Sequence, residues 1–178
     1  MNQPIEVWER HEILIEFHPH AYSLNQKIIE QSIKLYFAKH AVQAGGNDSN
    51  VKALQTKAID PDLDNMSSLK LVNRWILQLM GKCGGFHYEV FAAWLAKYQK
   101  GDYTISHDHL PAAFSFVYFV KCPKGSSPLI FTSSGKRIKA EEGKLVLFPG
   151  GVRHHVPKNK CDDRITYAGN FTVNSPGH

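Results

Sequence analysis

FHYEVFAAWLAKY, residues 86–98, opens a run of segments rich in β-branched and aromatic residues that continues to residue 173. The later segments are DYTISHDHL (102–110), AAFSFVYFV (112–120), SPLIFTS (127–133), KRIKA (136–140), KLVLFPG (144–150), HHVP (154–157) and RITYAGNFTV (164–173). Short turns such as QKGD, KCPKGSS and EEG separate them. This rhythm predicts an antiparallel β-sandwich or barrel in the second half of the chain.

Two helices are expected ahead of this β region. Apolar residues recur at helical spacing from Leu24 to Phe37, and Ser23 is a candidate N-cap. A second helix is expected after Ser67 or Ser68, either of which could cap it, with Gly81 just past its end. We expect one or two short strands in residues 5–17, a weak strand in residues 51–59, and helices that buttress one sheet. We therefore predict a single domain, 1–178, with a helix-containing part (1–85) and a β core (86–174).

The composition is that of an ordinary globular protein of 178 residues, 43% hydrophobic and 21% charged. No apolar stretch is long enough to span a membrane, and MNQPIEVWERHE does not resemble a secretory signal, so we expect a cytoplasmic protein. The formal charge of +5 comes from scattered lysines and arginines, which makes nucleic acid an unlikely partner. Nothing in the sequence indicates an oligomeric state.

His107 and His109 are the first indication of chemistry. Residues two apart on a strand point to the same face, so these imidazoles project together while Asp108 points away. A third ligand can come from His154, which the buried segment before it delivers through a turn, and His155 is the competing choice. Three imidazoles suit iron, copper, nickel or zinc and leave other coordination positions open.

Arg164 and Thr166 also share one strand face. A guanidinium binds a carboxylate in a bidentate way, and the hydroxyl adds a third hydrogen bond. We therefore expect a small dicarboxylate that chelates the metal at one end and contacts Arg164 at the other.

The order of these motifs, from YQKGDYTISHDH through GKLVLFPGGVRHHV to DRITYAGN, resembles the Fe(II)- and 2-oxoglutarate-dependent dioxygenase superfamily, particularly its prolyl-hydroxylase-like bacterial and phage members. The resemblance covers about residues 91–173 and implies a double-stranded β-helix (jelly-roll, cupin-like) core. It implies metal ligation by His107 and His154, and binding of the 2-oxoglutarate C5 carboxylate by Arg164 and Thr166. Further candidates for the cosubstrate pocket are Tyr98, Tyr118 and Asn170.

His109 departs from the family pattern, which has Asp or Glu at this position. A neutral imidazole in place of a carboxylate leaves the metal one unit more positive. The alternative is a local bulge that presents Asp108 instead; strand parity favours His109.

The resemblance implies an Fe(II)-, 2-oxoglutarate- and O2-dependent hydroxylase that releases succinate and CO2, acting on a small molecule or on a peptide side chain such as proline. We expect the substrate at the open end of the barrel, under the loops at 45–50 and 60–65. Two other hypotheses stay open: a cupin-like three-histidine dioxygenase without 2-oxoglutarate, and a non-catalytic metal- or ligand-binding β-barrel.

Overall fold

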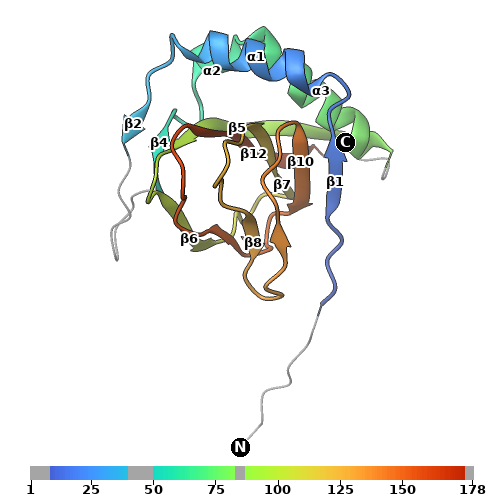
Figure 1. The fold of residues 1–178 in the computed structure, drawn as a ribbon. Coiled ribbons are helices and arrows are strands. Elements are labelled where there is room, and N and C mark those ends of the chain that lie inside the picture. Colours follow the sequence, from blue (N-terminus) through green and yellow to red (C-terminus); the bar gives the residue numbers. More distant parts are fainter. Residues whose placement is uncertain (1–8, 40–49, 83–86, 175–178) are drawn as a thin grey trace, which may run out of the picture.

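The computed structural model describes residues 9–39, 50–82 and 87–174. Its strands form two antiparallel sheets that face each other and enclose the interior of a barrel (Figure 1). The larger sheet has the order β1 (Leu14–Phe17), β10 (Lys144–Pro149), β7 (Phe114–Lys121), β12 (Arg164–Asn174), β5 (His87–Tyr98), β4 (Leu54–Gln55) and β2 (Ala38–Lys39). The smaller sheet has the order β3 (Val51–Lys52), β6 (Tyr103–His107), β11 (His154–Val156), β8 (Leu129–Phe131) and β9 (Arg137–Ile138).

Each of the segments expected to be extended in the second half contains a strand, β5 to β12 in chain order. The prediction of a mainly β protein with a jelly-roll core is confirmed. Strands from the first 85 residues complete the sheets, since β1 pairs with β10, β3 with β6, and β4 with β5. The boundary expected near residue 85 therefore does not separate the sheets, and the single-domain organisation stays a prediction.

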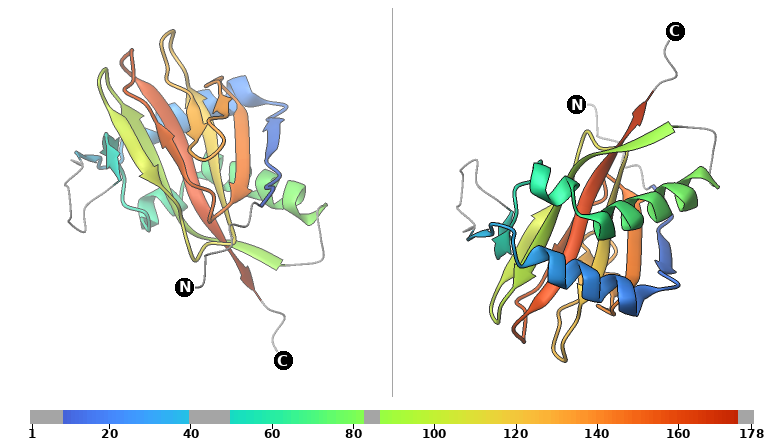
Figure 2. Two further views of the ribbon diagram at one scale, coloured as in Figure 1. Left: turned by 90° about the horizontal axis from the view of Figure 1, so that it is seen from below. Right: turned by 90° about the horizontal axis from the view of Figure 1, so that it is seen from above.

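Three helices, α1 (Ala21–Ser32), α2 (Pro61–Asp64) and α3 (Ser67–Gly81), cover the outer face of the larger sheet. Figure 2 shows α1 and α3 lying side by side across the strands. Their apolar faces pack on outward side chains of the sheet, including Phe116, Leu145 and Phe171. A second apolar cluster fills the space between the two sheets. Among the described residues, no helix has the length and hydropathy needed to cross a membrane.

The expected helix caps are wrong in both helices. The first helix begins at Ala21, and the hydroxyl of Ser23 donates to the carbonyl of His20 at 3.3 Å instead of capping. Neither Ser67 nor Ser68 is the N-cap of α3, a position held by Met66, whose side chain cannot accept from the helix. The last residue of α3 is Gly81, one position later than expected.

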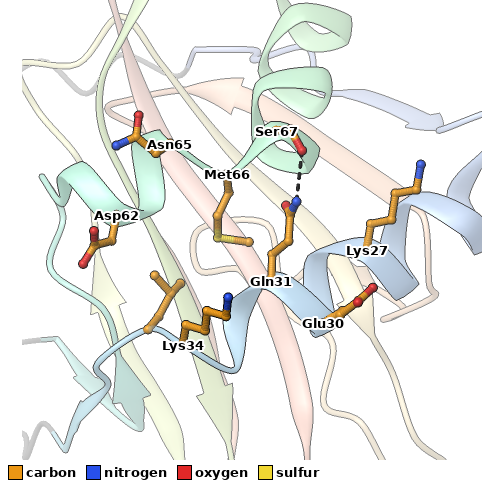
Figure 3. A pocket seen from close by; sticks show the side chains of 9 residues that line it. Lys27, Glu30, Gln31, Lys34, Asp62, Asn65, Met66 and Ser67 are labelled. Carbon is orange, nitrogen blue, oxygen red and sulfur yellow. Dashed lines mark hydrogen bonds between the residues drawn. The ribbon is translucent and has the colours of Figure 1, made fainter.

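The side chain of Gln31, from α1, takes over the capping of α3 (Figure 3). Its carbonyl oxygen accepts from the Ser68 backbone N–H at 3.3 Å and from the Ser68 hydroxyl at 2.6 Å, and its amide donates to the Ser67 hydroxyl at 3.0 Å. Gln31 lines a cavity of about 660 Å³ between α1 and the start of α3. This cavity belongs to the helical layer, so it is separate from the interior of the barrel.

Candidate metal and carboxylate site

The candidate site lies between the two sheets, with Arg164 and Thr166 on the larger sheet and His107 and His154 on the smaller one. Alternation along β12 sends Arg164, Thr166 and Ala168 inward, whereas Ile165 and Tyr167 pack toward the helices. A narrow cavity here is lined by Val51, Trp94, Tyr98, Thr104, His107, His109, Phe116, Val117, Leu129, His154, Val156, Arg164, Thr166 and Ala168. The three histidines and the Arg-x-Thr pair predicted from the sequence therefore share one cavity.

His107, His109 and His154 form a compact cluster. His107 ends β6 and His154 begins β11, and the two residues are direct partners in the antiparallel ladder. His109 follows two residues later and is held by its backbone N–H, which donates to the Gly150 carbonyl at 2.8 Å. The ring centroids are 4.5 to 5.1 Å apart, and one nitrogen from each ring lies within 4.8 Å of the others.

A bulge in β6 helps to place these rings. The ladder pairs His154 with His107 but Val156 with Thr104, so three steps along β6 match two along β11. The extra residue lets Thr104 and His107 both be buried, although strict alternation would place them on opposite faces, while Ile105 is exposed.

The hydrogen bonds of two rings fix which nitrogen faces the centre. The Nδ1 of His107 lies 2.8 Å from the Ile105 carbonyl oxygen, and the Nδ1 of His154 lies 3.0 Å from that of Val152. A carbonyl oxygen only accepts, so each Nδ1 carries the proton and each Nε2 keeps its lone pair. This is the tautomer that a metal-binding histidine needs.

The cluster is held in its neutral form. Burial and then the neighbouring His107 lower the pKa of His154 to about 3 and that of His109 to about 4. Burial also lowers the pKa of His107. Neutral imidazoles are the form that ligates, so the cluster needs no proton release at neutral pH before it can bind a divalent metal.

Asp108 and His155, the two alternative ligands, lie outside the cluster. The Asp108 carboxylate forms an ion pair with Arg153 at 2.9 Å and accepts from the Leu110 backbone N–H at 3.4 Å. The Nδ1 of His155 lies 3.2 Å from the Thr132 hydroxyl oxygen. This geometry does not bring either alternative into the cluster and favours His109 and His154, whose ligation stays a proposal.

Arg164 is the other distinctive residue of the cavity. Its side chain is 1% exposed, and its guanidinium carbon lies 4.5 Å from the ring centre of Tyr98 and 5.5 Å from that of Phe119. Its Nε and Nη1 are buried and have no hydrogen-bond partner among the described residues. Burying such donors without an acceptor is costly, so the site is complementary to an anion. Thr166, next on the same face, is also buried.

The three further candidates have different surroundings. Tyr98 lines the cavity beneath Arg164, and its hydroxyl lies 2.9 Å from that of Thr104. Tyr118 is a correction, because it points to the outer face, where its hydroxyl donates to the Asn25 side chain at 2.8 Å. Asn170 is on the inner face and accepts from the Ser115 hydroxyl at 2.8 Å, but it does not line the cavity. Six residues of strand place it about 20 Å from Arg164, too far to contact the same carboxylate.

Several residues around the site were not anticipated from the sequence. Phe119, rather than its neighbour Tyr118, packs against the Arg164 guanidinium. The ring centroid of Trp94 lies 5.9 Å from that of His109. Thr104 bonds with Tyr98. Alternation along β5 could have indicated Trp94, since it shares a face with Tyr98.

The expected position of the substrate loops is partly wrong. Residues 60–65 include α2, which belongs to the helical layer on the outer face of the larger sheet, so they do not cover the barrel interior (Figure 1). The loop expected at 45–50 lies outside the described residues except for residue 50.

Known protein structures share the fold of this chain. The fold is that of the 2-oxoglutarate- and Fe(II)-dependent oxygenases, and the solved structures it resembles include several prolyl hydroxylases. No protein-family model and no curated protein matches the sequence.

Two of the similar structures illustrate the likeness. A Pseudomonas putida prolyl-4-hydroxylase has a TM-score of 0.68 and 19% identity, over 92% of this chain and 94% of that one. The viral collagen prolyl hydroxylase of Paramecium Bursaria Chlorella virus-1, in a 2-oxoglutarate complex, has a TM-score of 0.64 and 15% identity, over 89% and 94%. The similarity thus extends over nearly the whole of each chain, and at these identities it establishes the fold.

Proposed function

We propose that this protein is an Fe(II)- and 2-oxoglutarate-dependent oxygenase that hydroxylates a substrate and releases succinate and CO2. The observation that carries the proposal is the buried Arg164 guanidinium, two of whose nitrogens have no acceptor in the described part of the chain, in the same cavity as three neutral imidazoles. A carboxylate bound to Arg164 can have its other end at a metal held by the histidines. The three-histidine donor set fits iron(II).

His107, His109 and His154 would hold the metal, which when bound supplies the oxygen chemistry. Arg164 and Thr166 would bind the distal carboxylate of 2-oxoglutarate, and Tyr98 supports the guanidinium from below. Trp94, Val117 and Ala168 give the cavity apolar walls that limit the entry of water. These residues would bind, orient and shield the reactants, and a bound metal would supply the oxidation chemistry.

For the substrate, we propose a peptide side chain or a small molecule that enters from the end of the cavity opposite Arg164. One structurally similar protein is a Trichoplax adhaerens prolyl hydroxylase in complex with a peptide fragment of hypoxia inducible factor, with a TM-score of 0.69 and 15% identity. A prolyl residue is therefore the first substrate to test.

The test is an anaerobic titration of the metal-free protein with Fe(II) and then 2-oxoglutarate, monitored by visible absorption. We expect 2-oxoglutarate to bind only after iron and to give the weak charge-transfer band of a metal chelate. With oxygen and a peptide library, succinate should then form in step with hydroxylated product.

Two matched variants check the assignment of residues. His154→Ala should abolish the band by removing iron, whereas His155→Ala, one position along the same strand, should leave it intact. Iron binding without a band, and no succinate, would contradict the proposal and favour a three-histidine dioxygenase that does not use 2-oxoglutarate. No iron binding at all would leave a barrel without metal chemistry.

A further inference from the structure

The Asp108–Arg153 ion pair lies immediately behind the histidine cluster, on the outer side of the smaller sheet. Asp108 separates His107 from His109, and Arg153 directly precedes His154. One guanidinium nitrogen of Arg153 donates to the Asp108 carboxylate at 2.9 Å, and another donates to the Ser106 carbonyl at 2.7 Å. The Arg153 side chain therefore contacts both neighbours of His107, through the backbone carbonyl of Ser106 and the side-chain carboxylate of Asp108.

The strand ladder ends where this contact begins. His107 and His154 form the last regular pair between β6 and β11, and beyond this pair both segments continue as loops. His109 lies in the loop part, where its backbone N–H donates to the Gly150 carbonyl at 2.8 Å and its carbonyl accepts from the Ala112 N–H at 2.8 Å. The backbone of Arg153 is itself fixed, because its carbonyl accepts from the Thr132 N–H at 2.9 Å. Arg153 is thus an anchored residue that reaches across to the ligand-bearing loop.

We propose that Arg153 and Asp108 are positioning residues for the metal centre. This inference rests on the proposed function. Together they hold the His107–His109 segment against the strand that carries His154, so that one nitrogen from each of the three rings faces the same point before metal binds. Asp108, which the sequence alone leaves as an alternative ligand, acts from outside the coordination sphere.

The contact is better suited to positioning than to general stability. The Asp108 and Arg153 side chains are 30% and 54% exposed, and an exposed ion pair adds little to the stability of a fold. Metal affinity is more sensitive, because residues behind the ligands that orient them typically change it by about 10- to 100-fold. A small shift of the loop would move His109 while the two ladder-paired histidines stayed in place.

The experiment measures Co(II) affinity of the metal-free full chain from its visible absorption, together with the thermal midpoint without metal. We expect Arg153→Gln and Asp108→Asn each to weaken Co(II) binding by about 10-fold, with an unchanged midpoint. The double variant should lose no more than either single variant, because both changes remove one contact. Arg153→Lys should recover part of the loss, since a lysine can pair with Asp108 but has one nitrogen in place of the two that contact Asp108 and Ser106.

Arg137→Gln, an exposed arginine on β9 of the same sheet, is the matched control and should bind Co(II) like the wild type. An unchanged Co(II) affinity in Arg153→Gln overturns the proposal. So does a double variant whose fold-loss of Co(II) affinity equals the product of the fold-losses of the two single variants. If Asp108→Asn alone abolished Co(II) binding, Asp108 would be a ligand. If the variants lowered the thermal midpoint together with the Co(II) affinity, the contact would be merely structural. A wild-type protein that binds no Co(II) would instead contradict the proposed function.

Discussion

The two faces of the larger sheet are built from alternate residues of the same strands, yet they differ in how their polar groups are satisfied. On the outer face, Tyr118 and Tyr167 donate to Asn25 and Asn73 of the helices, and the buried donor there with no partner among the described residues is the neutral amide nitrogen of Asn25. On the inner face, Arg164 is as deeply buried as the core, and two of its charged donors have no hydrogen-bond partner among the described residues. Buried polar groups in native proteins are normally paired, so a bound ligand can supply the acceptors that the Arg164 donors on the inner face lack.

The largest effect on stability should come from the outer face. Phe171 is fully buried between the sheet and the helices and packs against Phe116, with ring centroids 5.4 Å apart. Phe171→Ala should lower the free energy of unfolding by about 3–5 kcal/mol, measured by urea denaturation. Phe171→Leu should cost less and leave 2-oxoglutarate affinity unchanged. A loss of affinity in Phe171→Leu would show that the two faces are not independent.

Replacing Arg164 on the inner face should weaken 2-oxoglutarate binding without lowering the stability of the fold. Arg164→Met should weaken 2-oxoglutarate binding by about 100-fold or more, because a buried charge-assisted pair is lost. The free energy of unfolding without 2-oxoglutarate should stay the same or rise, since an unpaired buried charge is removed. Calorimetric titration and urea denaturation measure the two quantities. A destabilised Arg164→Met variant with normal 2-oxoglutarate affinity would assign Arg164 to the core instead.

The histidines at the smaller sheet, across the cavity from this inner face, should also make the metal-free protein sensitive to acid. The pKa values of His109 and His154, about 4 and about 3, lie below the 6.5 of an unfolded histidine. Below pH 6.5 the unfolded chain therefore takes up protons that the folded chain does not, and stability falls as the pH falls toward 4.

Each such histidine contributes up to about 1.4 kcal/mol per pH unit, so about 2 kcal/mol should be lost between pH 6.5 and 5.5. Urea denaturation in the presence of a chelator measures this slope. His109→Asn and His154→Asn should each make the slope shallower. A slope that neither substitution changes would place the proton uptake elsewhere.

The architecture and the cluster of histidines were predictable because both follow from local periodicity. Alternation places Arg164 and Thr166 on one face of β12, and short turns separate the strands. The same rule predicts that His107 and His109 project together, although β6 ends at His107 and a hydrogen bond to Gly150 holds the backbone of His109. The turn after Pro149 then brings His154 beside His107 in the ladder. Strand parity thus contains most of the information needed to assemble the candidate site.

Strand alternation cannot place the residues whose positions were predicted wrongly or not at all. Both faces of β7 are apolar, so its sequence does not tell which face Tyr118 occupies, and a bulge between Ile165 and Thr166 shifts its register against β12. The Gln31 cap and the Arg153 ion pair join residues 37 and 45 positions apart. Such contacts appear only when the tertiary structure is known.

The smallest predicted effect tests whether Tyr118 lies on the outer face of the larger sheet. Its hydroxyl donates to Asn25, which is 3% exposed, so Tyr118→Phe leaves the Asn25 carbonyl oxygen without its donor. We expect a loss of about 1–2 kcal/mol in the free energy of unfolding and no change in 2-oxoglutarate affinity. Combining Tyr118→Phe with Asn25→Leu should recover stability, because both polar groups are then removed. If Tyr118→Phe instead weakened 2-oxoglutarate binding, Tyr118 would belong to the inner face and the contrast between the faces would fail at this strand.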